Sequence, residues 1–154
     1  MKNRHGFTLL EIMVTIGILG LLTVMATYAL RTARTKAYIR QAEGDLQMLA
    51  TATLQLAWDT SRWPNKALRT QPGSTEIWNI SIAAAGLEGT DGTYDEWKGP
   101  YFAGNIMDPW GNPYFFDPDY RVNGVDRVVV GSFGPNGVGR NLYDSDDIYV
   151  LLDD

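Results

Sequence analysis

The stretch that decides the fold is GFTLLEIMVTIGILGLLTVMATYAL, residues 6–30. From Phe7 to Leu30 its only charge is the carboxylate of Glu11. At about 1.5 Å per residue, a helix of this length reaches roughly 36 Å and can span the hydrocarbon core of a bilayer. We therefore predict a membrane-spanning helix over residues 7–30. A secretory signal peptide is the alternative, but its apolar region would be shorter and would end in an A-x-A site, which is absent here.

The composition narrows the classes of function. The 154 residues carry a net charge of −5, no cysteine and one histidine, His5. Beyond residue 40 no basic stretch is dense enough to replace phosphate counterions, so a nucleic-acid partner is not expected. The missing cysteines exclude disulfides and thiolate metal sites, and a lone N-terminal histidine gives no support to Ser-His or zinc chemistry. We expect a protein that is not an enzyme, with protein or membrane partners.

Glu11 needs an explanation because a lone carboxylate in hydrocarbon costs about 2.5–3.5 kcal/mol on insertion scales. An ionisable residue inside a membrane segment is a functional candidate by default. One interpretation is that Glu11 merely lies near the membrane interface. Another is that it pairs with a cationic group on its own chain or on a neighbouring helix.

The first eleven residues, a short basic leader followed by Gly6-Phe7-Thr8-Leu9-Leu10-Glu11, resemble the class III signal of type IV pilins and type II secretion pseudopilins. The resemblance implies that prepilin peptidase removes residues 1–6 and that Phe7 is N-methylated. It also implies a single-pass protein of the bacterial inner membrane, with residues 31–154 as a periplasmic domain.

Two features of the sequence do not follow this family pattern. The positive-inside rule favours a cytoplasmic C-terminus, because four basic residues follow the span: Arg31, Arg34, Lys36 and Arg40. We give the leader motif precedence over that rule. In addition, Tyr28 stands where the family usually has a proline, which argues against a proline-assisted melting of the stem.

Within this family Glu11 becomes the fifth mature residue, and its natural partner is the new α-amine of Phe7. The amine of the same chain lies one helical turn back. In a filament of staggered helices the amine of a neighbour can take its place. We favour the neighbour, because the full leader motif accompanies Glu11.

The remaining sequence predicts an α+β fold of the pilin-like kind, a long helix packed on a small antiparallel sheet. No proline interrupts residues 7–62, and an apolar stripe continues the helix to about residue 60: Ala33, Ala37, Ile39, Ala42, Leu46, Leu49, Thr53 and Leu56. Residues 62–104 are rich in turn formers and predict a loop region with a short helix at 80–85. Strands are predicted at 114–117, 127–132 and 148–152.

A second resemblance covers the C-terminal half. WKGPYF (97–102), DPWGNPY (108–114), GSFGPNG (131–137) and DSDDI (144–148) resemble segments of the major pseudopilin of type II secretion systems. Taken alone, DPWGNPY predicts a structural corner, in which prolines set the turn and two aromatic rings pin it. The resemblance implies a homopolymer that drives secretion together with minor pseudopilins and inner-membrane secretion components. A surface type IV pilin, and a membrane-anchored enzyme or calcium-dependent domain, stay open as alternatives.

The last loop, residues 133–148, is a candidate calcium site. Calcium prefers six to eight oxygen ligands in a flexible loop. This segment offers Asn136 and a cluster of aspartates, although an ordinary solvated turn or neutralisation by Arg140 would also account for them. The resemblance to major pseudopilins implies a calcium ion held by the following groups: the Phe133 carbonyl, the Asn136 side chain, and carboxylates of Asp144, Asp146 and Asp147.

Overall fold

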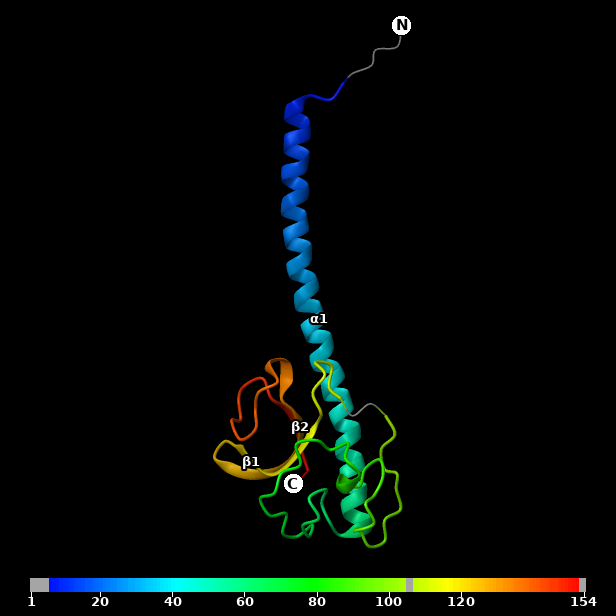
Figure 1. Cartoon of the computed structure of the whole chain (residues 1–154). Coiled ribbons are helices and arrows are strands. Elements are labelled where there is room, and N and C mark those ends of the chain that lie inside the picture. The colour runs from blue at the N-terminus through cyan, green and yellow to red at the C-terminus, as the bar shows by residue number, and fades with distance from the viewer. Residues whose placement is uncertain (1–5, 105–106, 153–154) are drawn as a thin grey trace. The chain divides into compact units, whose positions relative to one another are not determined.

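The computed structural model describes residues 6–104 and 107–152 (Figure 1). All of the predicted leader except Gly6 lies outside the described residues. A single helix, α1, runs over Leu9–Thr60, as the proline-free stretch predicts. The chain divides into two compact units, residues 1–37 and 38–154, which are described separately.

In the first unit, every described side chain of α1 is exposed, and most of these side chains are apolar. The segment is long and apolar enough to cross a membrane. A helix that is apolar all round needs lipid or other helices around it. At Tyr28, where the family proline is missing, the helix continues without a break and the side chain is 76% exposed.

In the second unit, α1 becomes amphipathic and buries one stripe. Burial begins at Ala42, so the predicted stripe starts too early: Ala33 and Ala37 are exposed and Ile39 is only half-buried. The buried members recur at helical spacing: Ala42, Leu46, Leu49, Ala50, Thr53, Leu56, Ala57 and Thr60. Leu46, Leu49, Ala50, Leu56 and Ala57 form the main core together with side chains from the sheet and the loops.

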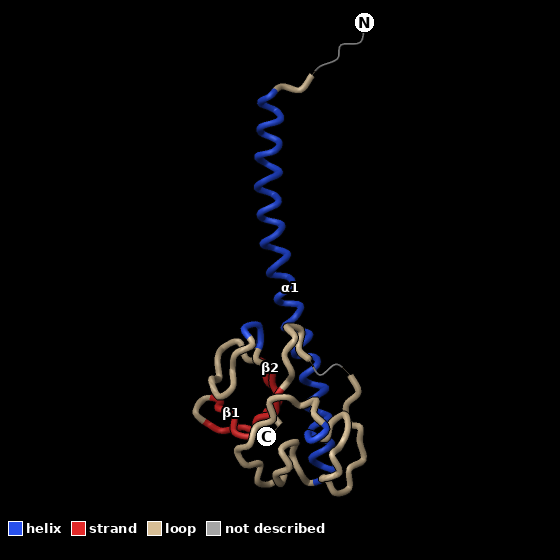
Figure 2. Tube along the Cα trace, in the orientation of Figure 1, coloured by secondary structure: helices blue, strands red, loops and turns tan. Residues whose placement is uncertain are grey.

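The sheet is antiparallel, in the order β1-β2-β3. Its strands are drawn in red in Figure 2. Its strands are β1 (Phe115–Val122), β2 (Val125–Ser132) and β3 (Ile148–Leu151), so all three predicted strands are confirmed. Phe116, Val128 and Val130 belong to the core that contains α1. A second, smaller cluster consists of Phe115, Tyr120, Val129 and Phe133, with Trp78 packed against it.

Strand β1 is longer than predicted because Pro118 does not end it. The pairing with β2 shifts register between Asp117 and Tyr120, which leaves Pro118 in a bulge. A proline cannot donate to the ladder, so a bulge is one of the few places in a sheet that accept it. At the other end, Asn123 and Gly124 both have positive φ and close the β1–β2 hairpin.

The region 62–104 is irregular, as predicted, but the helix expected at 80–85 is only a three-residue 3-10 turn, Ala83–Ala85. It is this short because Ile82 is extended and Gly86 turns the chain with φ +81°. Buried aromatic rings hold the region in place of regular structure. The Trp97 Nε1 group donates to the Gly86 carbonyl at 2.8 Å, and the buried Tyr94 hydroxyl lies 2.9 Å from the Pro64 carbonyl.

Asp117 is a buried carboxyl in the bulge of β1, 1% exposed. Burial raises the pKa of Asp117 to about 7, and the nearby carboxylates of Asp119 and Glu76 push in the same direction. Because the folded-state pKa lies above the usual value of about 3.9, the folded protein holds an extra proton between these two pH values. This contribution to stability is complete below about pH 4 and is lost progressively as the pH rises from there to about 7.

We therefore predict that Asp117→Asn, which stays neutral, matches the wild type in stability below about pH 4 and exceeds it by a margin that grows until about pH 7. An amide oxygen can still accept the bond that the Asp119 N–H donates at 2.9 Å. Thermal unfolding of the full chain in detergent at a series of pH values measures this, with the exposed substitution Glu43→Gln as the control. Parallel pH curves for wild type and Asp117→Asn would contradict it.

Candidate assembly and metal sites

Glu11 closes a capping box at the start of α1. The Thr8 N–H and the Thr8 hydroxyl donate to Glu11 Oε2 at 2.9 and 3.0 Å, and the Glu11 N–H donates back to the Thr8 hydroxyl at 3.2 Å. Such reciprocal bonds satisfy amides that a helix start leaves unpaired. The sequence interpretation missed Thr8, although T-x-x-E before an apolar run is the signal for this motif.

The capping box uses only one of the two carboxylate oxygens of Glu11. All of its bonds go to Oε2, and Oε1 accepts no hydrogen bond from the residues that the structure describes. The carboxylate is fully exposed. Glu11 can therefore hold its own helix start and still offer one oxygen to a cation from outside.

The predicted cleavage site lies immediately before the helix. Gly6, Phe7 and Thr8 have no helical structure, and the Phe7 side chain is 84% exposed. A peptidase needs an extended, accessible backbone at the bond that it cuts. Gly6 and Phe7 lie outside the helix and are exposed, so the bond between them is accessible.

The DPWGNPY segment is built around Asp108, which is 4% exposed. Its Oδ1 accepts from the N–H groups of Trp110 at 3.0 Å and Asn112 at 2.8 Å, which fixes the turn. Its Oδ2 accepts from the Ser132 hydroxyl at 2.6 Å, at the end of β2. The expected corner is present, but this central role of Asp108 was not predicted.

The hydrogen bonds that begin at Asp108 continue through Ser132 into the candidate metal loop. The Ser132 hydroxyl accepts from the Gly134 N–H at 3.1 Å. Gly134 has φ +62°, and a Cβ there would collide with the backbone carbonyl oxygen of Asp146. The two ends of the loop are thus packed against each other, and only glycine fits the crossing point.

Three of the five predicted ligands lie together. The Asn136 side-chain N–H₂ donates to Asp144 Oδ2 at 2.8 Å and to Asp146 Oδ1 at 2.6 Å, and the Asn136 backbone N–H donates to Asp146 Oδ2 at 3.1 Å. The bond from the Asn136 amide holds the pKa of Asp144 below its usual value. The amide therefore supplies the positive partial charge that these two carboxylates share.

Asp147 is close to the other two aspartates but bonds to the sheet and not to Asn136. Its Oδ2 accepts from the Tyr120 hydroxyl at 2.7 Å, while its Oδ1 is buried and has no hydrogen-bond partner in the described chain. Burial raises the pKa of Asp147 to about 6. Phe133 stacks its ring on Phe115 with centroids 4.6 Å apart.

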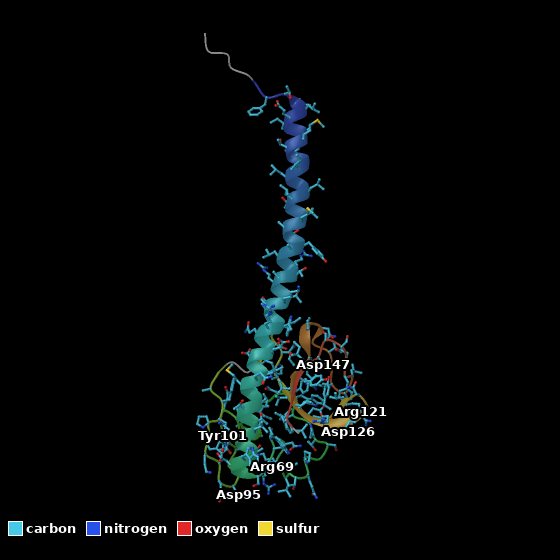
Figure 3. The ribbon with its side chains drawn as sticks, turned by 180° about the vertical axis from the view of Figure 1, so that it is seen from behind. Arg69, Asp95, Tyr101, Arg121, Asp126 and Asp147 are labelled. Carbon is cyan, nitrogen blue, oxygen red and sulfur yellow. The ribbon has the colours of Figure 1, made fainter. Side chains whose placement is uncertain are left out.

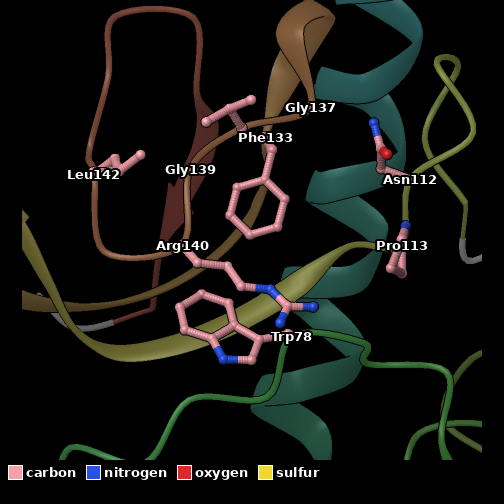
Figure 4. Close-up of a pocket in the computed structure, with 9 residues that line it drawn as sticks. Trp78, Asn112, Pro113, Phe133, Gly137, Gly139, Arg140 and Leu142 are labelled. Carbon is pink, nitrogen blue, oxygen red and sulfur yellow. The ribbon is translucent and has the colours of Figure 1, made fainter.

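Arg140 does not neutralise the aspartates, contrary to one of the alternatives considered above. Its guanidinium lies over the Trp78 ring, 5.6 Å from the centroid (Figure 4). Within the described residues it forms no salt bridge. With Phe133, Leu142, Pro113 and Trp78 it lines a pocket of about 350 Å³ beside the loop.

The loop fits calcium by its donor chemistry. Its groups are hard oxygens, and the unpaired buried oxygen of Asp147 is one that a cation would satisfy. As arranged here, however, no group of three or more acidic or histidine side chains in the described chain converges on one point. Calcium binding therefore stays a prediction.

Similarity to known proteins agrees with the geometry of the N-terminus. Residues 1–27 match the family model described as the prokaryotic N-terminal methylation motif. No solved structure matches the chain.

Curated relatives cover almost the whole chain. The type II secretion system core protein G of Klebsiella pneumoniae is 33% identical over 96% of this chain and 94% of its own length. The protein of the same name from Aeromonas hydrophila is 34% identical over 92% of each chain, and that from Pectobacterium carotovorum is 39% identical over 88% of this chain and 79% of its own. On this similarity, the chain belongs to the family of type II secretion system core protein G, the major pseudopilins.

Proposed function

We propose that this chain is a structural subunit, not an enzyme, that polymerises into a periplasmic pseudopilus driving type II protein secretion. The observation that carries the proposal is the apolar half of α1, whose described side chains are exposed all round. Nothing in its own unit covers them. Before assembly the lipid of the inner membrane covers them, and after assembly other copies do so.

The charge of Glu11 favours transfer of the subunit from the lipid into the filament. In hydrocarbon its charge is costly, whereas an ion pair with the Phe7 amine of a neighbour removes that cost. The unused Oε1 provides the acceptor, and cleavage after Gly6 creates the donor. The partners on this proposal are prepilin peptidase, further copies, minor pseudopilins and inner-membrane secretion components, and the domain after the span lies in the periplasm.

A surface type IV pilus would use the same span and the same cleavage. Similarity to secretion core proteins over nearly the full chain favours the secretion pseudopilus over that alternative. A membrane-anchored enzyme finds less support, because the buried carboxyls Asp108 and Asp117 serve the turn and the bulge.

We predict that Gly6→Leu leaves the leader uncut. A peptidase that is specific for glycine has no room for a leucine side chain at the cleavage position. Mass spectrometry of the membrane fraction should show a protein heavier by residues 1–6, without the N-methyl group. Gly20→Ala, in the middle of the span, should be cut normally. Normal cleavage of Gly6→Leu would contradict the assigned site.

We predict that Glu11→Leu still inserts into the membrane but fails to enter filaments, and that secretion stops. The substitution also removes the helix cap, which is worth about 1 kcal/mol. Thr8→Val is the matched control, because it weakens the cap and keeps the carboxylate, and it should still assemble. Sheared-filament yield and the amount of secreted protein are the measurements. Wild-type secretion by Glu11→Leu would count against a role in assembly.

We also propose that residues 133–147 bind calcium through the Phe133 carbonyl, Asn136, Asp144, Asp146 and Asp147. The donor types support this, as does the buried oxygen of Asp147 that has no partner. Calcium would replace the Asn136 amide as the positive partner of the carboxylates. Because Tyr120 also bonds to Asp147, the ion would tie the loop to the sheet.

We predict that calcium raises the melting temperature of the full chain in detergent and that a chelator reverses the gain. A ligand at one hundred times its Kd contributes about 2.7 kcal/mol. The gain should vanish in Asp147→Asn and persist in the hairpin variant Asp126→Asn. It should also fall as the pH drops through about 6, where Asp147 takes up a proton. Equal melting temperatures in calcium and in chelator would refute the site.

A further inference from the structure

The charges of this chain are separated along its length. Residues 31–40, which we call the basic band, carry four basic residues and no acidic one: Arg31, Arg34, Lys36 and Arg40. Residues 41–154 carry 7 basic and 17 acidic residues. The basic band is therefore followed by a domain of opposite, acidic net charge.

The basic band is free to meet a partner. All four of its basic side chains are exposed, and none forms a salt bridge with any residue that the structure describes. At 100° per residue, Arg31 and Arg34 share one face of α1, whereas Lys36 and Arg40 point to the opposite face. The band can thus accept acidic partners from more than one side.

Outside the candidate metal loop, acids without a salt bridge gather in the segment 88–96, which we call the acidic loop. Its sequence is EGTDGTYDE, and Glu88, Asp95 and Glu96 are exposed and without a salt bridge in the described chain. The fourth acid, Asp91, pairs with Lys66 at 2.6 Å. The acidic loop thus keeps three free carboxylates.

The backbone of the acidic loop is held firmly, so the carboxylates are presented from a fixed frame. The Lys66–Asp91 pair and the buried Tyr94 anchor its middle. Its base lies at the C-terminal end of α1, where Lys98 Nζ and the Tyr101 hydroxyl lie 3.2 and 3.1 Å from the Asp59 carboxylate. Figure 3 shows Asp95 and Tyr101 at this end of the domain.

The acidic loop lies far from Arg40, the basic residue of the band that belongs to the same compact unit. Along α1, Asp59 lies about 28 Å from Arg40, the nearest basic residue of the band. A salt bridge needs contact, and exposed charges are largely screened beyond about 8 Å at physiological ionic strength. Pairing between the acidic loop and Arg40 therefore has to join different copies.

We propose that the acidic loop 88–96 of one copy docks on the basic band 31–40 of another copy, displaced by roughly 30–40 Å along the helix axis. The inference rests on the proposed homopolymer and adds a specific contact to it. Exposed ion pairs are individually weak, so this contact sets register and orientation more than affinity. Anionic lipid headgroups would also suit a band that follows a membrane span. The matching set of free acids on the same molecule favours a second copy.

Cysteine cross-linking tests the contact, because the chain has no cysteine of its own. One tagged copy carries Thr35→Cys, at an exposed position in the band, and a second carries Gly89→Cys, where an added Cβ meets open space. Both are expressed in cells that contain the whole secretion system and are mildly oxidised. We expect a disulfide-linked heterodimer. Val125→Cys, on the exposed hairpin, is the matched control for Gly89→Cys and should give none.

Charge reversal then shows whether electrostatics carry the contact. Reversing the loop by Glu88→Lys, Asp95→Lys and Glu96→Lys should abolish the heterodimer, as should reversing the band by Arg31→Glu, Arg34→Glu and Lys36→Glu. Combining a reversed band on one copy with a reversed loop on the other should restore it. If the combination fails to restore the heterodimer, the band acts elsewhere, for instance on lipid, and the proposal is wrong.

A span-to-span control separates this inference from the proposed function. In the staggered filament, where Glu11 of one copy meets Phe7 of a neighbour, residue 16 of one copy lies opposite residue 12 of that neighbour, so the control joins Ile16→Cys on one copy to Ile12→Cys on another. If this span pair cross-links while the Thr35–Gly89 pair does not, copies assemble without the contact and only the docking proposal fails. If the span pair gives no cross-link and no filaments are recovered by shearing, the homopolymer itself is refuted and the docking proposal with it.

Discussion

The constraint on which the rest of the molecule depends is that half of α1 has no cover within its own unit. An apolar helix exposed on every side is stable only in lipid or against other helices. The domain of residues 38–154 must therefore build its own core, and it does so from Ala42 onward with the buried stripe of the same helix. One unbroken helix thus has two different surroundings. Its apolar half needs lipid or other helices around it, and its amphipathic half packs on the domain, with burial beginning at Ala42.

The elements that sequence predicts well are those specified by local rules. The long helix follows from the missing prolines, and the three strands follow from short apolar runs between turn formers. The differences arise where a neighbour overrides local preference. Strand β1 passes Pro118 because a register shift accommodates it, and the turn at Ala83–Ala85 stays short because Gly86 reverses the chain.

The polar framework of the domain was much harder to predict, because its bonds join residues far apart in sequence. Asp108 fixes its own turn, which local spacing suggests, but its bond to Ser132 crosses to the end of β2. Asp147 belongs to an acidic cluster in the sequence, yet its carboxylate faces Tyr120. The acidic cluster and the resemblance to major pseudopilins identified the candidate loop, and only the fold shows that its aspartates have different surroundings. The capping box of Thr8 and Glu11 is the exception, because the sequence spacing T-x-x-E predicts it and the sequence interpretation missed it.

Two kinds of charge contact follow from where the charges lie. A pair between Glu11 and an amine would form among apolar helices, where the low dielectric strengthens attraction and salt has little access. Pairs between the basic band and the acidic loop would form between exposed side chains, where salt weakens them. The buried pair suits the role of holding a subunit in place, because breaking it leaves an uncompensated charge in an apolar surrounding. The exposed pairs suit the role of selecting register, because weak contacts can be broken and remade until the buried pair closes.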